Sequence, residues 1–332
     1  MKVLVVGGSG YVGSRLCALL QAGGWATPVS ASSRRPADGV ASLRVDTRDR
    51  AALTQALTGM DAVVNCVAGD AASIAEGARL LAEASRAAGC KRIVHLSSMS
   101  VYGPLEGRVD ENAPLDPSLG WYGRAKCDAE RHIAGFAGSG GEAVILRPGC
   151  VWGPGSQLWV GRIARLLRAG RLGDLGIAGD GWSNLVHVYD VCAAVAAALR
   201  SPSAGGIATY NLAAPDSPRW NEYFVDLALA ISATPVRRLS PRQLRLDAFV
   251  AGPPLKIAHM VLDKAGIGSG ALPDPLPPNL LGLWERHLWL DSSAAQRDLN
   301  IRWTSYPAAL QESAAWFLKQ ESPCRIERAA PQ

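Results

Sequence analysis

The sequence has no CxxC pair, and its cysteines are few and dispersed along 332 residues. An odd, scattered set argues against a disulfide framework and against a cysteine-based zinc site, so we expect no metal. Reduced thiols of this kind are typical of cytoplasmic proteins, and we expect this protein in the cytoplasm. The seven positions are Cys17, Cys66, Cys90, Cys127, Cys150, Cys192 and Cys324.

Long hydrophobic runs are also missing, because every apolar stretch is interrupted well before the roughly 18 residues that a transmembrane helix needs. The apolar run after Lys2 meets glycine at Gly7, which is too early for a secretory signal and typical of a buried strand. Lysine and arginine form no stripe interleaved with aromatic residues, and the formal charge of +5 is small for this length. We therefore expect neither a membrane span nor a nucleic-acid partner.

The first half of the chain alternates strand-like and helix-like segments. Helical patterns occur at Ser14–Ala22 and Ala71–Ala88, each closed by glycine. Strands separated by helices of this length predict right-handed βαβ units, hence an α/β fold with a Rossmann-type, doubly wound parallel sheet. The strand candidates are Val3–Val6, Pro28–Ala31, Ser42–Val45, Ala62–Cys66, Arg92–Leu96 and Ala143–Leu146.

After Pro148 the alternation breaks down. Ala208–Leu212 is a further strand candidate for the edge of the sheet, and Gly252–Pro278 is expected to be an irregular, mobile or wrapping segment. This organisation predicts a smaller, discontinuous, mainly helical substrate-binding domain beside the sheet. We expect residues 1–154 and 185–214 to form the dinucleotide-binding domain, and residues 155–184 and 215–332 to form the substrate-binding one.

A glycine-rich loop follows the first strand, in the sequence GGSGYVG. The glycines let the chain turn sharply and approach a pyrophosphate closely, and the helix that follows offers free backbone N–H groups to the phosphates. The position of this loop between a strand and a helix makes a dinucleotide site the favoured interpretation over an empty turn. We expect Gly7, Gly10, Tyr11, Val12 and Gly13 to contact the cofactor.

The end of the second strand indicates which dinucleotide is bound. An NAD site usually places a carboxylate there, whereas this chain has Ser33, Arg34 and Arg35. Guanidinium groups suit a 2′-phosphate, so NADP is favoured, although NAD stays possible because Asp38 could supply the acid. Asp46, at the end of the third strand, is either a partner for the adenine amino group or a helix N-cap.

Tyr122 and Lys126 lie four residues apart, on one face of a predicted helix over Tyr122–Phe136. A phenol is a poor base at neutral pH, and a neighbouring ammonium would lower its pKa. The strand before them ends in Ser97 and Ser98, which a parallel sheet would bring to the same edge as the cofactor.

These segments resemble those of the extended short-chain dehydrogenases/reductases, a family that includes nucleotide-sugar epimerases, 3β-hydroxysteroid dehydrogenases and dihydroflavonol reductases. The resemblance covers most of the first 215 residues and weakens towards the C-terminus. The matching motifs are GGSGYVG, SSMSVYG, the DENAPLDP and YGRAK stretches, LRPGCVWGPG and LVHVYDVCAA.

The resemblance implies roles for several residues. Tyr122 would be the proton donor or acceptor at the substrate oxygen, and Lys126 would lower its pKa and bind the nicotinamide ribose. Ser98 aligns with the residue that hydrogen-bonds the reacting oxygen, with Ser97 and Ser100 as rivals. The loop Val67, Ala68 and Gly69 would pass beside the cofactor, and Pro148 would cover its nicotinamide end.

Other residues near these motifs are weaker candidates. Cys150 and Trp152, with Ser98 and Ser100, are expected near the substrate, although cysteine and tryptophan are more often ordinary core residues. His187 and Asp190 are more often structural hydrogen-bonding groups than chemical ones.

The resemblance also narrows the chemistry. Dehydratases of the family carry an Asp-Glu pair where this chain has Met99 and Ser100, and many nucleotide-sugar enzymes have asparagine where it has Cys150. We therefore expect an NADP(H)-dependent oxidoreductase that reduces a ketone or aldehyde, or oxidises the alcohol, on a small molecule with an apolar part. A nucleotide-sugar epimerase that holds NAD tightly and a non-catalytic dinucleotide-binding sensor are the alternatives.

Two expectations concern assembly and the C-terminal region. The resemblance makes a homodimer through helices near Tyr122 plausible. The stretch Leu280–Leu290 is expected to be an ordinary packed helix, with a cap over an apolar pocket as the alternative.

Overall fold

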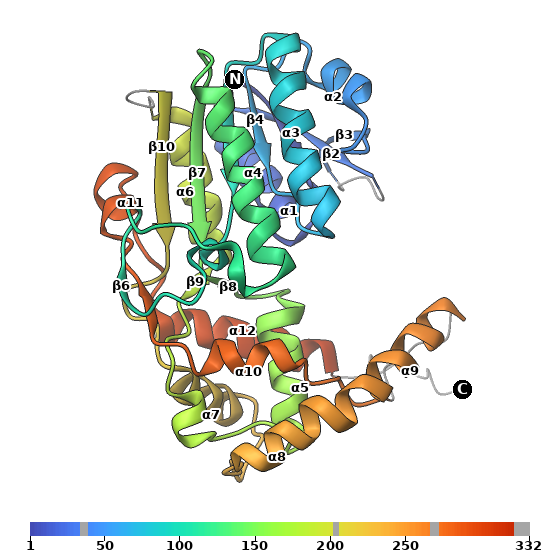
Figure 1. The fold of residues 1–332 in the computed structure, drawn as a ribbon, viewed down its shortest axis with the longest axis vertical. Helices are drawn as coiled ribbons and strands as arrows, with labels where there is room; N and C mark the ends of the chain where they lie inside the picture. Colours follow the sequence, from blue (N-terminus) through green and yellow to red (C-terminus); the bar gives the residue numbers. More distant parts are fainter. Residues whose placement is uncertain (34–38, 202–205, 266–271, 322–332) are drawn as a thin grey trace, which may run out of the picture. The chain divides into compact units, whose positions relative to one another are not determined.

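A seven-stranded sheet, in which each paired strand is parallel to its neighbour, is the centre of the computed structural model. The structure describes residues 1–33, 39–201, 206–265 and 272–321. The strand order is β10-β7-β5-β4-β1-β2-β3 (Figure 1). The strands are β1 (Lys2–Val6), β2 (Thr27–Ser32), β3 (Ala41–Arg44), β4 (Ala62–Asn65), β5 (Arg92–Leu96), β7 (Glu142–Pro148) and β10 (Ile207–Leu212).

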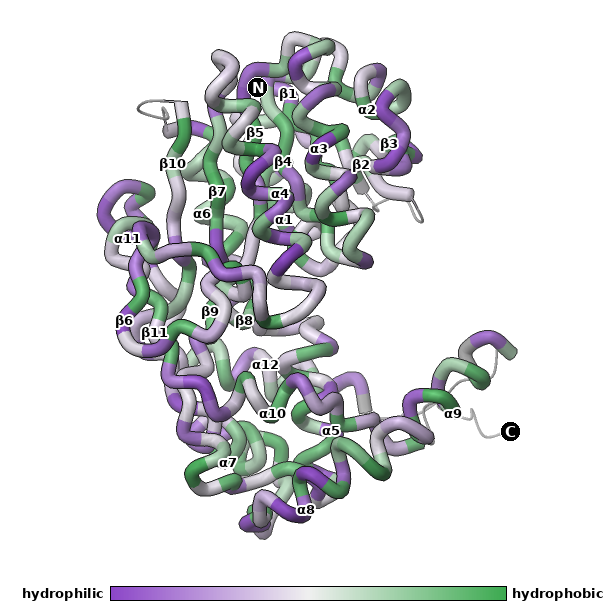
Figure 2. The backbone as a smooth tube through the Cα atoms, viewed as in Figure 1, coloured by the Kyte–Doolittle hydropathy of each residue, from purple (hydrophilic) through white to green (hydrophobic). Residues whose placement is uncertain are grey.

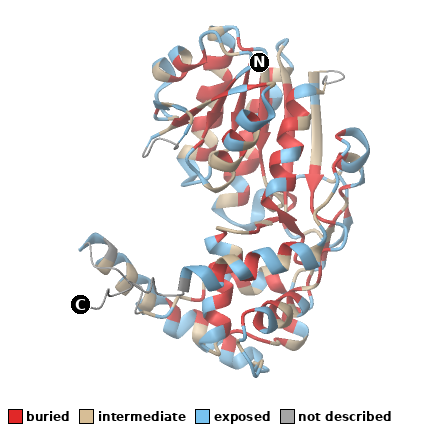
Figure 3. Cartoon of the chain, turned by 180° about the vertical axis from the view of Figure 1, so that it is seen from behind, coloured by how far each residue is buried: buried red, intermediate tan, exposed pale blue. Residues whose placement is uncertain are grey.

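Successive residues of the central strands alternate between two apolar layers, as the period of two requires. In β1, Val3 and Val5 belong to one layer, and Leu4 and Val6 belong to the other. The buried residues of both layers are coloured red in Figure 3. Helices α1 (Tyr11–Gly23) and α6 (Val188–Arg200) cover the first layer, and α2 (Arg50–Leu57), α3 (Ala71–Ala88) and α4 (Trp121–Ala137) cover the second.

This architecture confirms the predicted α/β fold with a Rossmann-type parallel sheet. Each predicted strand is present, and α3 has the predicted bounds. The strands read as nearly continuous apolar runs because both of their faces are covered by helices.

Two compact units make up the chain. The first contains the sheet and comprises residues 1–151, 182–217 and 286–304, and the second comprises residues 152–181, 218–285 and 305–332. Residues 286–304, which we expected in the substrate-binding domain, belong to the first unit. The reason is strand pairing, because β11 (Leu288–Leu290) lies parallel to β6 (Gly107–Val109). The first unit also contains the short helices η1 (Met99–Tyr102), η2 (Pro117–Leu119) and α11 (Ser293–Asp298), and the strand β9 (Leu185–His187). The strand β8 (Cys150–Trp152), which pairs with β9, begins in the first unit, and its last residue, Trp152, is the first residue of the second.

The second unit is helical, as predicted, around an aromatic centre. Trp220 and Trp284 are fully buried, and Phe224 lies 5.6 Å from the first ring and 5.1 Å from the second. Its helices are η3 (Gln157–Gly161), α5 (Arg162–Arg168), η4 (Gly176–Gly179), α7 (Trp220–Ala230), α8 (Pro241–Leu246), η6 (Asp247–Ala251), α9 (Gly252–Lys264), α10 (Pro278–Trp284) and α12 (Tyr306–Glu321).

Two expectations for the second half were wrong. The segment Gly252–Pro278 is helical over its first 13 residues, which form α9. The stretch Leu280–Leu290 is not one helix, because α10 ends at Trp284 and the remainder forms β11. No helix in the described part of the chain is both long and apolar enough to cross a bilayer.

Candidate functional site

The candidate site lies where four neighbouring strands of the first unit end. Because the strands are parallel and paired in register, the segments after β1, β4, β5 and β7 share one edge of the sheet. This is the edge at which Rossmann-type folds bind ligands. The glycine loop, Val67, Ser98 and Pro148 all come from these four strand ends.

The glycine loop is shaped by close backbone packing. Gly7 has φ +79°, a conformation that glycine adopts freely, and its Cα faces the backbone of Cys66. A Cβ on Gly13 would collide with the backbone of this loop, including the Gly8 Cα at 2.8 Å. These two glycines therefore hold the loop tightly against β4 and the start of α1.

The N-terminus of α1 is suited to an anion. Gly10 is the N-cap residue and provides no side-chain hydrogen bond, and the first turn, with Tyr11, Val12 and Gly13, contains no acidic residue. The positive end of the helix dipole is thus uncompensated by a local carboxylate. The backbone that would hold a pyrophosphate is in place, so these residues fit the cofactor that the glycine motif predicts.

The structure describes only some of the residues expected to bind the adenosine part of the dinucleotide. Ser33 is exposed in the bend after β2, whereas Arg34 and Arg35 lie outside the described residues. Asp46 accepts hydrogen bonds from the backbone and the guanidinium of Arg48, which lower the pKa of its carboxyl. The N-cap alternative for Asp46 was wrong, because Asp49 caps α2 by accepting from Ala52 N–H.

Lys126 is buried at the sheet edge. Its Nζ donates to the carbonyl oxygen of Leu96 at 2.7 Å and to that of Val67 at 3.3 Å. Burial lowers the pKa of this ammonium to about 8. Among the described residues, its acceptors are two neutral carbonyl oxygens. The ammonium therefore has a third N–H that can bind a ligand, and it lies beside Val67, which begins the loop that includes Ala68 and Gly69. Such a group fits the hydroxyls of a ribose.

Tyr122 lies one helical turn before Lys126, beside Ser98. Hydrogen bonding by the Ser98 hydroxyl lowers the pKa of the Tyr122 phenol, whereas burial and the charge of a Cys150 thiolate would raise it. Ser98 also accepts from the Ser100 backbone N–H at 3.2 Å, which fixes its side chain at the start of η1. The structure therefore brings Ser98 and Tyr122 together.

The pKa of Tyr122 differs from the expected direction. Burial raises it above its ordinary value, and only the hydrogen bond from Ser98 opposes this shift. We expected Lys126 to lower it, but the ammonium lies 5.9 Å from the centre of the Tyr122 ring and is turned towards backbone carbonyls. The phenol is accordingly protonated at neutral pH.

Glycine allows α4 to approach the Ser98 segment closely. A Cβ on Gly123 would meet the Ser100 carbonyl oxygen at 2.8 Å. The neighbour of Tyr122 in sequence therefore lets this helix pack directly on η1. This contact sets the distance between the phenol and the serine hydroxyl.

A buried ion pair that sequence reasoning missed anchors the middle of α4. Arg147 of β7 donates to both carboxylate oxygens of Glu130, at 3.0 and 2.8 Å, and to the Tyr102 hydroxyl at 2.9 Å. Tyr102 in turn donates to Asn211 of β10 at 2.7 Å. The network ties α4 to two strands and to η1. In the sequence, Arg147 and Tyr102 stand out only as members of the LRP and VYG motifs.

His95 of β5 was also missed. Its side chain is 1% exposed, and neither ring nitrogen has a hydrogen-bond partner among the residues that the structure describes. Burial, with a contribution from Lys126, holds its pKa well below the ordinary range. The ring is thus a neutral group beneath the buried ammonium.

The remaining candidates have ordinary surroundings. Pro148 ends β7 and is buried, and Ser100 has a buried hydroxyl with no acceptor or donor within the described ranges. Trp152 is 2% exposed in the second unit, stacked on Tyr306, which is the packing of a core residue. Asp190 accepts from both the backbone and the hydroxyl of Thr304, the structural role expected for it.

Comparison with known proteins identifies related sequences. The profile of the NAD dependent epimerase/dehydratase family matches residues 3–213. A 2-alkyl-3-oxoalkanoate reductase from Stenotrophomonas maltophilia is 32% identical over 59% of this chain and 64% of its own length. A 3-diazoavenalumate denitrifying reductase from a Streptomyces species is 31% identical over 72% of this chain and 84% of its own. The first of these alignments spans just under two thirds of the relative.

Epimerases also occur among the matches. An N-acetyl-alpha-D-glucosaminyl-diphospho-ditrans,octacis-undecaprenol 4-epimerase from Escherichia coli O157:H7 is 27% identical over 61% of this chain and 65% of its own length. A solved UDP-glucose 4-epimerase from Thermotoga maritima, with UDP-glucose, superimposes with a TM-score of 0.74 at 18% identity, over 96% of this chain and 99% of that one. At this identity the superposition shows the shared fold.

Proposed function

Because the chain belongs to the NAD-dependent epimerase/dehydratase family of extended short-chain dehydrogenases/reductases, we propose that it is an NADP(H)-dependent reductase of a ketone or aldehyde. The surroundings of Tyr122 carry this proposal. Within the described residues, the side chains that shift the pKa of its phenol are the Ser98 hydroxyl, which lowers it, and the buried Cys150 thiol, which raises it. One proton donor in an apolar setting suits the single proton transfer of carbonyl reduction.

Three residues of this chain would take part in the reduction. Ser98 donates a hydrogen bond to the carbonyl oxygen and orients it, and the Tyr122 phenol delivers the proton to that oxygen. Lys126 binds the nicotinamide ribose with the N–H that its two carbonyl partners leave available. A nicotinamide held in this way would supply a hydride for the carbonyl carbon, and with the proton from Tyr122 the carbonyl would become an alcohol.

Cys150 supports a substrate with an apolar part. Its side chain is 1% exposed, and burial keeps its thiol protonated by raising the pKa above the ordinary range. A neutral thiol beside the reacting phenol offers van der Waals contact rather than a strong hydrogen bond to a sugar hydroxyl. Relatives named as reductases of an oxoalkanoate and of other carbonyl compounds support the same class.

The preference for NADP rests on Arg34 and Arg35, which follow β2 in sequence. Titration calorimetry with NADPH and NADH tests it, on purified full-length protein whose absorption spectrum has first been checked for bound nicotinamide. We expect tighter binding of NADPH, and we expect Arg34→Ala with Arg35→Ala to weaken NADPH at least about tenfold while NADH changes little. Arg131→Ala, which removes an exposed arginine of α4, is the matched control.

The activity itself is tested by following NADPH loss with a panel of ketones and aldehydes that carry alkyl chains of increasing length. Turnover that rises with chain length supports the proposal. Tightly retained NAD, a clear preference for NADH, or turnover of nucleotide sugars alone would contradict it and favour an epimerase.

A further inference from the structure

The segment 241–264 exposes a concentrated set of apolar side chains. It is a continuous helical run made of α8, η6 and α9. Six of the 17 large hydrophobic residues that are exposed in the described chain fall within it, and each is more than half exposed. Figure 2 shows hydrophobic positions recurring along α9, and Figure 3 shows this helix in the colours of exposed and intermediate residues. The six are Leu246, Phe249, Val250, Ile257, Met260 and Val261.

In α9 the exposed apolar residues share one face. Ile257, Met260 and Val261 have the i, i+3, i+4 spacing that places side chains together on a helix. Lys264 follows at i+7 from Ile257, on the same face one turn later. Figure 1 shows α9 running out from α5, α10 and α12 of its own unit rather than along them, and the three apolar side chains of this face are each more than half exposed.

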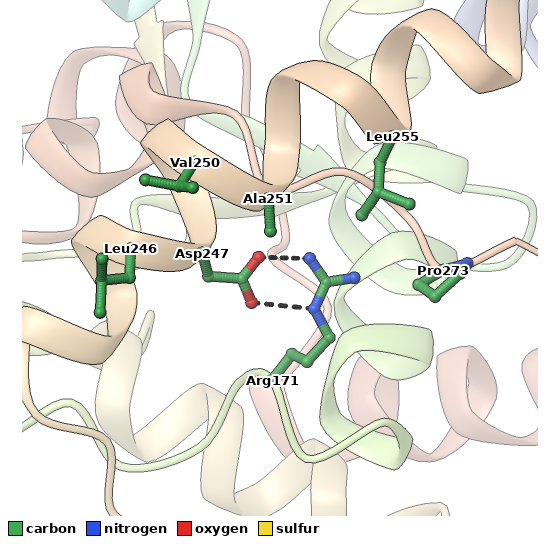
Figure 4. A pocket seen from close by; sticks show the side chains of 7 residues that line it. All are labelled: Arg171, Leu246, Asp247, Val250, Ala251, Leu255 and Pro273. Carbon is green, nitrogen blue, oxygen red and sulfur yellow. Dashed lines mark hydrogen bonds and ion pairs between the residues drawn. The ribbon is translucent and has the colours of Figure 1, made fainter.

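A hollow continues the apolar surface towards α8. It has a volume of about 500 Å³, and Leu246 and Val250 belong both to its lining and to the exposed set (Figure 4). The other apolar lining residues are Ala251, Leu255 and Pro273. Single exposed hydrophobic residues are normal on a protein surface. A group of them next to a hollow is instead typical of an interaction site.

The charged lining residues of the hollow neutralise each other. Arg171 forms a two-pronged ion pair with Asp247, with the Nε donating at 2.8 Å, and one terminal nitrogen donates to the Asp274 carbonyl oxygen at 2.7 Å. Because Asp247 neutralises the charge of this guanidinium, the hollow suits an apolar chain better than an anionic group.

Most charged side chains of the segment 241–264 are basic. Its acidic residues are Asp247, which Arg171 neutralises, and Asp263, against the basic set Arg242, Arg245, Lys256 and Lys264. Arg237 and Arg238 precede it. An apolar face bordered by lysine and arginine is the pattern of helices that lie in the surface of an anionic bilayer. Two copies of this chain would instead bring like charges together, which disfavours self-association through this face.

We propose that residues 241–264 form a membrane-surface docking element, which lays the apolar face of α9 and η6 into the headgroup region of an anionic lipid bilayer. The bilayer covers the exposed apolar side chains, the basic residues meet anionic headgroups, and one lipid chain enters the hollow beside Arg171. The helices lie parallel to the bilayer surface and do not cross the membrane. It does not rest on the proposed reductase activity.

Co-sedimentation with vesicles tests the proposal on the full-length protein. We expect the protein to pellet with vesicles of phosphatidylcholine mixed with phosphatidylglycerol, and much less with phosphatidylcholine alone. Added salt should weaken the binding, because screening reduces attraction to the anionic surface. Ile257→Glu with Met260→Glu should reduce binding at least about tenfold. Arg245→Gln with Lys256→Gln should reduce binding to the mixed vesicles alone, by about tenfold.

The matched control is Ile177→Glu with Leu229→Glu, which alters two exposed apolar residues of the same unit outside the segment. This variant should bind vesicles as the wild type does, and circular dichroism should show all variants folded. Failure of the wild type to pellet with the mixed vesicles overturns the proposal, as does unchanged binding by the Ile257/Met260 variant. A dimer that this variant splits into monomers, without vesicle binding by the wild type, assigns the face to a second copy instead.

Discussion

The Lys126 ammonium donates a 2.7 Å hydrogen bond to the carbonyl oxygen of Leu96, at the end of the strand that leads to the candidate site. This contact fixes a cation where water is excluded, since the side chain is only 2% exposed. The pKa of the lysine falls to about 8 because burial penalises the charged form. The geometry thus directs the ammonium to the carbonyl oxygens of Leu96 and Val67, while it lies 5.9 Å from the centre of the Tyr122 ring.

The lowered pKa of Lys126 predicts a pH-dependent stability. Between about pH 8 and 10.5 the unfolded lysine keeps its proton while the folded one does not, so unfolding takes up a proton. Rising pH therefore favours the folded state over this range. We expect the free energy of unfolding of the cofactor-free wild type, relative to Lys126→Met, to increase from pH 8 to pH 10.5. Urea denaturation at several pH values measures it, and a flat difference would contradict the shift.

Tyr122→Phe removes the proposed proton donor without altering the loop that would hold the cofactor. We expect turnover to fall by about 10²- to 10⁴-fold, the usual contribution of a positioned acid, while NADPH affinity stays within a factor of about two. Ser98→Ala should also lower turnover, because the phenol loses the partner that opposes the rise in its pKa. An active Phe variant would refute the assignment of Tyr122.

Gly13→Ala tests the close packing of the glycine loop. The new Cβ would collide with backbone atoms of Gly7 and Gly8, which are fixed and cannot yield as a flexible side chain would. We expect a loss of about 1–3 kcal/mol in the free energy of unfolding, together with weaker binding of NADPH. Thermal denaturation and calorimetric titration measure the two effects.

Gly135→Ala is the control for that variant. Gly135 lies in the last turn of α4, and its added Cβ would meet no atom within 4 Å beyond the backbone of its own helix. Alanine is the better helix former, so this change should raise the free energy of unfolding by up to about 1 kcal/mol. Equal destabilisation by both variants would show that the loop packing is not the cause.

Local patterns predicted the part of the site that the chain builds from neighbours in sequence. The strand, glycine turn and helix around Gly10 follow from adjacent residues, and the parallel order of the strands places Ser98 and Lys126 at one edge. Their roles, however, came from the family resemblance and stay a proposal.

Pairings between distant residues were not predictable in the same way. Arg147 and Glu130 are each compatible with an exposed helix or strand position, and nothing local indicates that they meet in the core. Leu288–Leu290 extends an apolar helical pattern, yet it pairs with Gly107–Val109 far away in sequence. In the opposite sense, Pro253 and Pro254 suggested an irregular chain, but they lie inside a helical run, directly after the π-helical turn η6. Wide turns of this kind are where a helix adjusts its backbone hydrogen bonds, and prolines follow one here.

Glu130→Gln tests the buried ion pair as the anchor of α4. The side chains of Arg147 and Glu130 are 7% and 4% exposed, so losing the carboxylate leaves a buried guanidinium without its counter-charge. We expect a loss of about 3–5 kcal/mol in the free energy of unfolding. Asp128→Asn, on the same helix, alters a carboxylate paired with the exposed Arg131 and should change stability little. Similar losses for both would show that the burial of the pair does not matter.

His95→Leu tests the neutral histidine below the site. The groups around it are the ammonium of Lys126, which disfavours a second positive charge, and the neutral strand neighbours Asn65 and Ile145. As the pH falls below 6.5, the unfolded histidine gains a proton that the folded one cannot accept, so the folded state loses stability by up to about 1.4 kcal/mol per pH unit. We expect the free energy of unfolding of the wild type to drop more between pH 7 and pH 5 than that of His95→Leu. Urea denaturation measures both free energies. If they fall equally between pH 7 and pH 5, His95 is protonated inside the folded protein, and its pKa is not lowered by burial and Lys126.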